Sequence, residues 1–535
     1  MIHQLPAGSA RRLLRRATTV SLFTTLGVAV GFLVDVLLLA RFGVGASTDA
    51  YLGGYTVPLI FITCLTAVEP VLVTILAGYQ GDEAAFAVLL NTAGLISLAV
   101  AALGALLARP LITATMPGFA AETAAQATLL ARILFARVPA TAVSEVCKAE
   151  LYARRRFGLA TLSNVFPGLI TAIVLALPRT SSDIKIVAIS AVAGALLQAA
   201  VLVAELLGRQ RVPYRWTLRH TTPVLSQTGR LLAAPLVGLL LRQGVVLAER
   251  FFGSHLAAGG VTALSYASRL TMTVAGIGFD GINTASLPSL VDRWRHGAAR
   301  EARDELAALF KLMITVALPV GLMVAALGNP LVLLFFQRGQ VDRQAALLLG
   351  TVFSVYALSL LALGPFRAAQ NFFYAVQEMR PIIVLHGSLT ALAVLLDWVL
   401  VGPLGPTGLA LSFAISSGII AIAATVWVAR RAGDLAWRRL ADSFWRLGVA
   451  SAAMAGVALL LSSRLQPAAL EWGRWGLIAT LALSGLAGCL VFSGVGGALR
   501  VEPIVSLWRL AKERCGRRKT PPPAPPARGR ELEEP

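Results

Sequence analysis

Runs of apolar residues, separated by short polar segments, occupy almost the whole chain. A helix needs about 20 apolar residues to cross the hydrocarbon core of a bilayer. Read at that width, the pattern predicts about fourteen membrane-spanning helices. We expect them near residues 18–42, 51–78, 86–108, 126–150, 157–178, 184–207, 229–252, 260–291, 305–328, 345–372, 381–402, 405–429, 445–463 and 475–496. The chain is therefore predicted to be an all-α polytopic membrane protein.

The composition supports a membrane protein and excludes several functional classes. Of 535 residues, 57% are hydrophobic and 14% are charged, whereas soluble domains carry about 25% charged residues. The four cysteines, Cys64, Cys147, Cys489 and Cys515, form no CxxC or His-rich spacing. Neither a disulfide framework nor a metal site is indicated. The chain also lacks the GxxxxGK[ST] motif of ATP-binding loops.

The net charge of +20 predicts the orientation of the chain rather than a nucleic-acid partner. Basic residues stand in short clusters between apolar spans, as in cytoplasmic loops. If the N-terminus lies in the cytoplasm, alternate loops on that side carry the basic clusters at 154–156, 209–219, 293–303, 430–439 and 509–519. An even number of spans then returns the C-terminus to the cytoplasm as well.

The last segment, Thr520–Pro535, reads TPPPAPPARGRELEEP. Its Pro-rich, charged composition cannot bury a core and predicts disorder. Two interpretations remain open: a plain solvated tail, or a Pro-rich ligand for a cytoplasmic partner.

Charged residues inside the predicted spans are the first candidates for function. An unpaired charge at the bilayer centre costs on the order of 3 kcal/mol by insertion scales. Asp35, in the first span, is therefore expected to face a water-filled cavity or a partner; the alternative is a cap or an ion pair with Arg41. Arg242 and Glu249 share one helical face about two turns apart, so they form either an internal pair or part of a site.

Two other polar positions have structural interpretations. Glu145 and Lys148 have the spacing of a helical ion pair and are expected to form a structural cluster. His386 is flanked by apolar residues and is expected to be packed or hydrogen-bonded rather than to relay protons.

A weak internal repeat relates the two halves of the chain. GASTDAY from Gly45 and GGVTALSY from Gly259 open corresponding helices. Leu151-Tyr152-Ala153 and Phe373-Tyr374-Ala375 likewise precede corresponding spans. Parallel repeats with a site between the halves are typical of transporters, although chance similarity between Ala- and Leu-rich helices remains the alternative.

Several of these segments resemble one known family. FGVGASTDAYLGGYTVP, at 42–58, resembles the FG-G--TDAF--A---PN signature of the MurJ/MviN lipid II flippases. Further similar segments occur in the family's order, at 132–164, 259–270, 284–290, 333–342, 372–381 and 402–412.

The resemblance implies the fold of the multidrug/oligosaccharidyl-lipid/polysaccharide (MOP) exporters, with two six-helix bundles in a V and two additional C-terminal helices. We accordingly expect a basic cytoplasmic N-terminus at 1–17, bundles at 18–225 and 226–435, two helices at 436–500 and a tail at 501–535. It also implies a flippase, not an enzyme, that moves a polyprenyl-diphosphate-linked saccharide such as lipid II across the bacterial inner membrane by alternating access. Its partners would be this substrate and the membrane lipids.

The family's cavity contains arginines that meet the substrate diphosphate, and Arg269 stands at one of these positions. The arginine that usually precedes the aspartate of the first helix is Val34 here, and apolar residues at 59–62 replace a basic pair. We call the set of cations that binds the diphosphate the grip, and we expect it to be rebuilt here from other cations. The resulting candidate cavity residues are Arg269, Asp35, Arg41, Asp49, Glu69, Arg242 and Arg367.

The resemblance also points to a cation site. Glu249 and Asp397 stand where some family members carry acidic sodium ligands, although an asparagine of that site is Ala393 here. Carboxylates suit a hard cation such as Na⁺. No cofactor is expected. Sodium or the membrane potential, which supplies about 2.3 kcal/mol per charge at 100 mV, would drive the cycle.

Three other functions remain as alternatives. A drug or cation antiporter of the same superfamily would favour a cavity dominated by carboxylates. A polyprenyl-dependent glycosyltransferase or polymerase would carry acidic motifs on large outer loops, and the predicted outer loops are short. An inactive flippase-like scaffold is compatible with the replaced arginines.

Overall fold

The computed structural model describes residues 7–79, 83–177, 183–212, 214–217, 223–433 and 437–501. Every regular element within these ranges is a helix, as the apolar pattern predicts. The predictions for the Pro-rich tail and for Cys515 concern residues outside these ranges.

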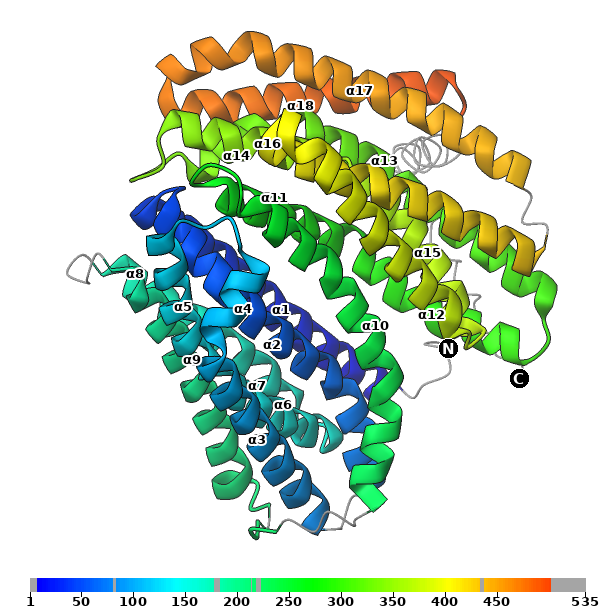
Figure 1. Ribbon diagram of the computed structural model, residues 1–535. Helices are drawn as coiled ribbons and strands as arrows, with labels where there is room; N and C mark the ends of the chain where they lie inside the picture. Colours follow the sequence, from blue (N-terminus) through cyan, green and yellow to red (C-terminus); the bar gives the residue numbers. More distant parts are fainter. Residues whose placement is uncertain are drawn as a thin grey trace, which may run out of the picture.

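The first half of the chain forms one bundle, at the lower left in Figure 1. Helix α2 packs along α5 and α6 and so forms its centre. The elements are α1 (Ala7–Phe42), α2 (Ala46–Gly78), α3 (Glu83–Leu106), α4 (Ala108–Thr115), α5 (Ala121–Phe135), α6 (Arg137–Ala153), α7 (Phe157–Leu162), η2 (Ser163–Val165), α8 (Phe166–Ala176), α9 (Lys185–Ala204) and the π-helical turn η3 (Glu205–Arg209).

The second half forms another bundle, and α10 (Pro223–Gly253) links the two. Helix α10 packs against both α2 and α16. The remaining elements of this bundle are α11 (Gly260–Ala275), the π-helical turn η4 (Gly276–Asp280), α12 (Gly281–Arg295), α13 (Ala299–Phe336), α14 (Arg343–Ala357), α15 (Leu360–Ala375) and α16 (Met379–Ala432). Two additional helices, α17 (Trp437–Glu471) and α18 (Gly473–Ala498), pack on each other and on α13, at the top of Figure 1.

The number of spans differs from the prediction. Among the described residues, 11 helices are long and apolar enough to cross a membrane, or up to 12 if the bent pair in α10 counts as one span. The predicted count of about fourteen is therefore not confirmed. Helix α16, counted once here, consists of two helices that meet at a kink at Gly405, whose angles are non-helical (φ 56°, ψ −136°). The kink lies between the predicted spans 381–402 and 405–429. The predicted span 260–291 forms α11, η4 and α12, where Arg269 and many hydroxyl residues reduce the apolarity.

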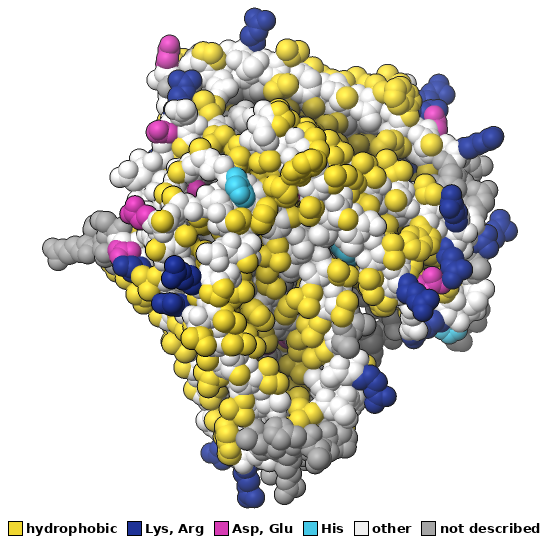
Figure 2. Space-filling view, in the orientation of Figure 1, with side chains coloured by type: hydrophobic (Ala, Val, Ile, Leu, Met, Phe, Trp, Pro, Cys, Tyr) yellow, Lys and Arg dark blue, Asp and Glu magenta, His cyan; other side chains and the backbone are white. Residues whose placement is uncertain are grey.

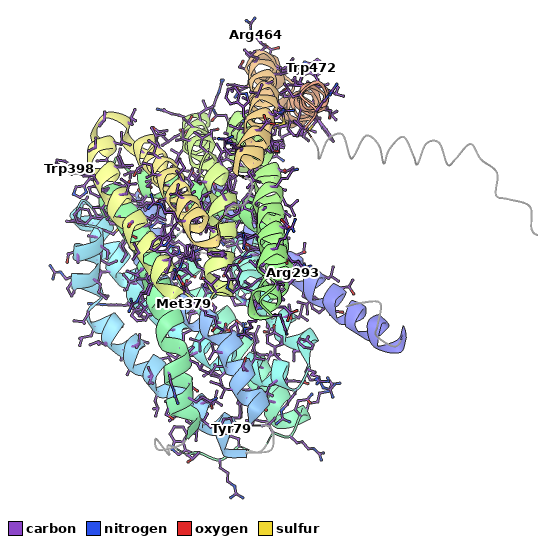
Figure 3. All side chains as sticks on the ribbon, turned by 90° about the vertical axis from the view of Figure 1, so that its right-hand side faces the viewer. Tyr79, Arg293, Met379, Trp398, Arg464 and Trp472 are labelled. Atoms are coloured by element: carbon purple, nitrogen blue, oxygen red, sulfur yellow. The ribbon has the colours of Figure 1, made fainter. Side chains whose placement is uncertain are left out.

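The outer surface is that of a protein embedded in a bilayer. Hydrophobic side chains cover most of the face in Figure 2, and Lys and Arg side chains gather at its margins. The exposed side chains of Trp398 and Trp472 lie towards the upper end of the molecule in Figure 3, and Tyr79 lies at the opposite end. Amphipathic rings of this kind favour the interface between lipid and water.

The two bundles are joined at one end, at the upper left in Figure 1. The backbone N–H of Gln340 donates to the carbonyl oxygen of Ala40 at 2.8 Å, and that of Gly118 donates to Ser254 Oγ at 3.0 Å. Gly339 (φ +56°) approaches so closely that a Cβ there would lie 2.0 Å from the Ala40 oxygen. Only glycine fits this position. We call this set of contacts the joined end.

Candidate functional site

An ion pair connects the two bundles between α1 and α11. Arg269 Nη1 lies 2.8 Å from Asp35 Oδ1. The Asp35 side chain is 6% exposed, whereas that of Arg269 is 56% exposed. Asp35 is thus paired with Arg269 and not with Arg41. Because more than half of Arg269 is open, its guanidinium retains N–H donors for an anion.

Aromatic residues of α2 extend this charged group towards α6. Tyr51 and Tyr55 lie one turn apart, with stacked rings whose centroids are 6.1 Å apart. Arg137 Nη1 donates to the Tyr55 hydroxyl at 2.8 Å, and its guanidinium lies over the same ring. Asp35, Arg137 and Arg269 all act electrostatically on Tyr51. One region therefore holds two guanidiniums and a single carboxylate, an excess of positive charge.

The Arg137 guanidinium also has a free donor. Its buried Nε has no hydrogen-bond partner among the described residues. Unpaired donors inside a protein are costly. Arg137 and Tyr55 are not among the residues predicted from the sequence. The signal that identifies Arg137 is its position inside the predicted span 126–150, since arginine is rare within membrane helices.

Asp49 lies at the joined end, away from Arg269's ion pair. Its carboxylate accepts hydrogen bonds from the backbone N–H of Gly259 (2.6 Å), the backbone N–H of Thr262 (2.7 Å) and the Thr262 hydroxyl (2.5 Å). A carboxylate satisfies the free N–H groups at a helix start and complements its dipole. Asp49, from the first half, therefore caps α11 of the second half.

Two other predicted residues also have structural partners. Arg41 Nη1 donates to the carbonyl oxygens of Leu175 and Leu177, at the end of α8. Glu69 lies 3.0 Å from the Lys148 ammonium, which also lies 2.9 Å from Glu145. The predicted Glu145–Lys148 pair is thus confirmed, and Glu69 belongs to the same cluster.

The remaining predicted cations, Arg242 and Arg367, line one cavity of about 540 Å³ inside the second bundle. Arg367 forms an ion pair with Asp280. Among the described residues Arg242 has no ion-pair partner, so the Arg242–Glu249 pair considered above does not form. His386 lines the same cavity and is hydrogen-bonded to Gln370, as predicted.

The two acidic residues of the predicted cation site lie close together. Glu249 accepts a hydrogen bond from the Tyr356 hydroxyl at 2.8 Å. Asp397 is 1% exposed, its Oδ2 has no hydrogen-bond partner in the described structure, and its charge acts on Glu249. An unsatisfied buried carboxylate oxygen beside a second carboxylate is a fitting donor set for a hard cation.

Comparison with known proteins identifies the family. A family model described as lipid II flippase MurJ matches residues 38–474. The chain belongs to the MurJ family. Among curated relatives, a probable lipid II flippase MurJ of Rhizobium tropici is 26% identical over 83% of this chain and 86% of its own length. That of Buchnera aphidicola subsp. Acyrthosiphon pisum is 24% identical over 76% of this chain and 82% of its own.

Solved structures confirm the fold. A lipid II flippase MurJ in an inward closed conformation superposes with a TM-score of 0.74 at 17% identity, covering 90% of this chain and 99% of that one. An inward-facing multidrug resistance MATE family transporter of the MOP superfamily gives a TM-score of 0.64 at 17% identity, covering 76% and 94%. The expected MOP exporter fold is therefore confirmed, within which the MurJ family is the better match.

Proposed function

We propose that this member of the MurJ family is a flippase for a polyprenyl-diphosphate-linked saccharide in the bacterial inner membrane. The observation that carries the proposal is the Asp35–Arg269 pair between the bundles, with an open guanidinium. A guanidinium holds phosphate oxygens in a bidentate fork, which a lysine ammonium cannot do. A lipid-linked diphosphate is the substrate class that needs such a donor inside a membrane.

Arg137 supplies a second cation to this grip. Its link to Tyr55 holds the guanidinium near Tyr51, whose other charged neighbours are Asp35 and Arg269. Two cations suit the two phosphate groups of a diphosphate better than one. Arg137 therefore takes over part of the role of the family arginines that Val34 and residues 59–62 replace.

The transport cycle follows from the joined end. With both termini in the cytoplasm, the joined end faces outward and the headgroup enters from the cytoplasmic side, while the lipid tail stays in the bilayer. Opening of the joined end and closure of the other end then release the headgroup outside. In the same orientation, the Pro-rich tail at 520–535 lies in the cytoplasm, where a partner that binds polyproline helices would reach it.

Depletion of the protein tests the function directly. In a strain that depends on this chain, depletion should remove lipid-linked saccharide from the outer leaflet and accumulate it in the inner leaflet. Outer-leaflet saccharide is measured by its accessibility to a membrane-impermeant reagent, and re-expression of the full chain should restore it. An unchanged outer-leaflet pool after complete depletion would refute the flippase function.

We further propose that Glu249 and Asp397 hold a sodium ion, which would offset one of their two negative charges. Sodium should raise the melting temperature of the purified protein. At a sodium concentration of about a hundred times Kd, the free energy of unfolding should increase by about 2.7 kcal/mol. Asp397→Asn should remove this effect, while choline chloride at equal ionic strength should give none in either protein. If the parent protein responds equally to sodium and choline, the two residues are not a sodium site.

A further inference from the structure

The cluster of Glu69, Glu145 and Lys148 has a composition that the proposed grip does not explain. It lies within the first bundle, where α2 meets α6. Lys148 Nζ lies within 3.0 Å of both carboxylates and donates to Asn164 Oδ1 at 3.0 Å. Gln198 Nε2 donates to the same Asn164 oxygen at 3.2 Å. With all three groups ionised, the cluster carries one net negative charge inside membrane-spanning helices.

The two carboxyl groups share one ammonium and are therefore close to each other. Glu69 Oε2 lies 3.0 Å and Glu145 Oε2 lies 2.9 Å from the same Lys148 Nζ. Two carboxylate oxygens at this range repel unless a proton lies between them. A carboxyl–carboxyl hydrogen bond therefore requires one proton, and that proton also brings the net charge of the cluster to zero.

One buried oxygen indicates where the proton binds. Glu145 is 4% exposed, and its Oε2, although 2.9 Å from the ammonium, makes no hydrogen bond of normal geometry in the described structure. A buried carboxylate oxygen whose ion pair lacks hydrogen-bond geometry is incompletely stabilised, and a proton shared with Glu69 would complete its bonding. A metal ion does not suit this position, because the Lys148 ammonium already fills the space beside both carboxylates and would repel it.

The cluster has one exposed side and one buried side. The Glu69 side chain is 23% exposed and Asn164 is exposed, whereas Lys148 and Glu145 are at most 5% exposed. A proton can therefore enter at Glu69, the exposed carboxyl, and pass to Glu145.

The surrounding helices leave this charge uncompensated. On α6, Glu150 is paired with Arg154, and the Tyr152 hydroxyl, which borders the cluster, is hydrogen-bonded to Thr161. Helices α3 and α9, both packed on α6, carry charged residues only at their first positions, Glu83 and Lys185. Segments α7 and η2 carry none. Helix α5 carries Glu122 and Arg132, and α10, packed on α2, carries Arg230, Arg242, Glu249 and Arg250; none of these six forms an ion pair with the cluster.

We propose that Glu69 and Glu145 form an exchangeable proton site, and that protons are a coupling ion of this transporter. The site lies on helices that also carry the grip: α2 holds Tyr55 and the Asp49 cap, and α6 holds Arg137. Pro58 and Pro70 interrupt the hydrogen bonding of α2 between and beside these groups. Loss of the proton restores repulsion between α2 and α6 and so shifts the two helices that hold the diphosphate.

Infrared spectroscopy tests proton binding without any substrate. This test is therefore independent of the proposed flippase function, whereas the coupling rests on that function. The purified full chain in nanodiscs should show a protonated-carboxyl band that titrates with pH. Glu145→Gln and Glu69→Gln should each remove this band, and both mimic the protonated, neutral cluster and should fold. Glu150→Gln, which alters an ion pair on the same helix, should leave it unchanged. A spectrum of Glu145→Gln identical to that of the parent would overturn the proton site.

Vesicles test the coupling. With the membrane potential clamped at zero, a gradient of one pH unit should shift the distribution of lipid-linked saccharide between leaflets about tenfold for one coupled proton. Glu145→Gln should lose this response, and Glu150→Gln should keep it. A titrating band without any response to the gradient in an actively flipping parent would leave a proton site but overturn proton coupling. Absence of flipping in every protein would refute the flippase function instead.

Discussion

Replacing Arg269 by alanine is expected to abolish translocation of the lipid-linked saccharide. Arg269 is the open cation of the pair between α1 and α11, and hydrogen bonds between charged groups contribute about 1.5–3 kcal/mol each. Loss of a two-bond fork should therefore reduce transport on the order of a hundredfold or more. The measurement is outer-leaflet saccharide in a strain that depends on the variant.

Two further variants separate binding from folding. Arg269→Ala leaves the buried Asp35 without its partner, which destabilises a protein independently of any ligand. Arg269→Ala combined with Asp35→Asn removes that unpaired charge, and it should restore thermal stability without restoring transport. Arg269→Lys should keep partial transport, because the charge survives and the fork does not.

The matched control is Arg132, an exposed arginine on α5 of the first bundle. Arg132→Ala should transport normally. Full transport by the Arg269→Ala/Asp35→Asn protein would remove the diphosphate grip from the proposal and favour the antiporter or the scaffold.

Replacing Asp49 by alanine is expected to open the joined end. The Asp49 carboxylate accepts three hydrogen bonds from Gly259 and Thr262, across the two bundles. Their loss should weaken closure by on the order of 3 kcal/mol, more than a hundredfold in the ratio of closed to open molecules. Asp49→Asn should have a smaller effect, because its amide NH₂ cannot accept the second N–H.

Thiol labelling measures this opening. Val44→Cys, which places a thiol against Gly259, is introduced after the native cysteines are replaced, and an impermeant maleimide is added from outside. Labelling should be slow in the parent and fast with Asp49→Ala. Asp342 caps α14 by accepting the Ala345 N–H, a cap within the second bundle, so Asp342→Ala should leave labelling slow. Equal labelling rates for Asp49→Ala and the parent would show that the cap does not hold the joined end.

The sequence predicts the helices better than their contacts. Apolar length alone locates most spans, because a membrane helix satisfies its own backbone and needs only a hydrophobic surface. It is weakest along α11 and α12, where Arg269 and many hydroxyl residues lower the apolarity of the predicted span 260–291. In α16 it separates the two spans at the position of the Gly405 kink.

Hydrophobic periodicity does not predict which residues far apart in the chain form pairs. Asp35 has Arg41 within two turns, yet its partner is Arg269 on α11. The motif GASTDAY predicts the start of α2 correctly, but its Asp49 also caps a helix that begins more than two hundred residues later. By contrast, the Glu145–Lys148 pair follows from spacing on a single helix. Local pairs are readable from the sequence, whereas pairs between bundles depend on the packing of the whole fold.

The joined end also defines a target for inhibitors. In the proposed orientation its loops face the outside of the inner membrane, so a macrocycle or antibody fragment that bridges Ala40 and Gln340 would act without entering the cytoplasm. Such a molecule would clamp the transporter in one state by stabilising contacts that already exist. Resistance substitutions at Gly339 would carry a penalty, because any larger residue collides with the Ala40 backbone and disturbs the same closure. The close approach of Gly339 to Ala40 would thus limit the substitutions that give resistance to a drug bound at the joined end.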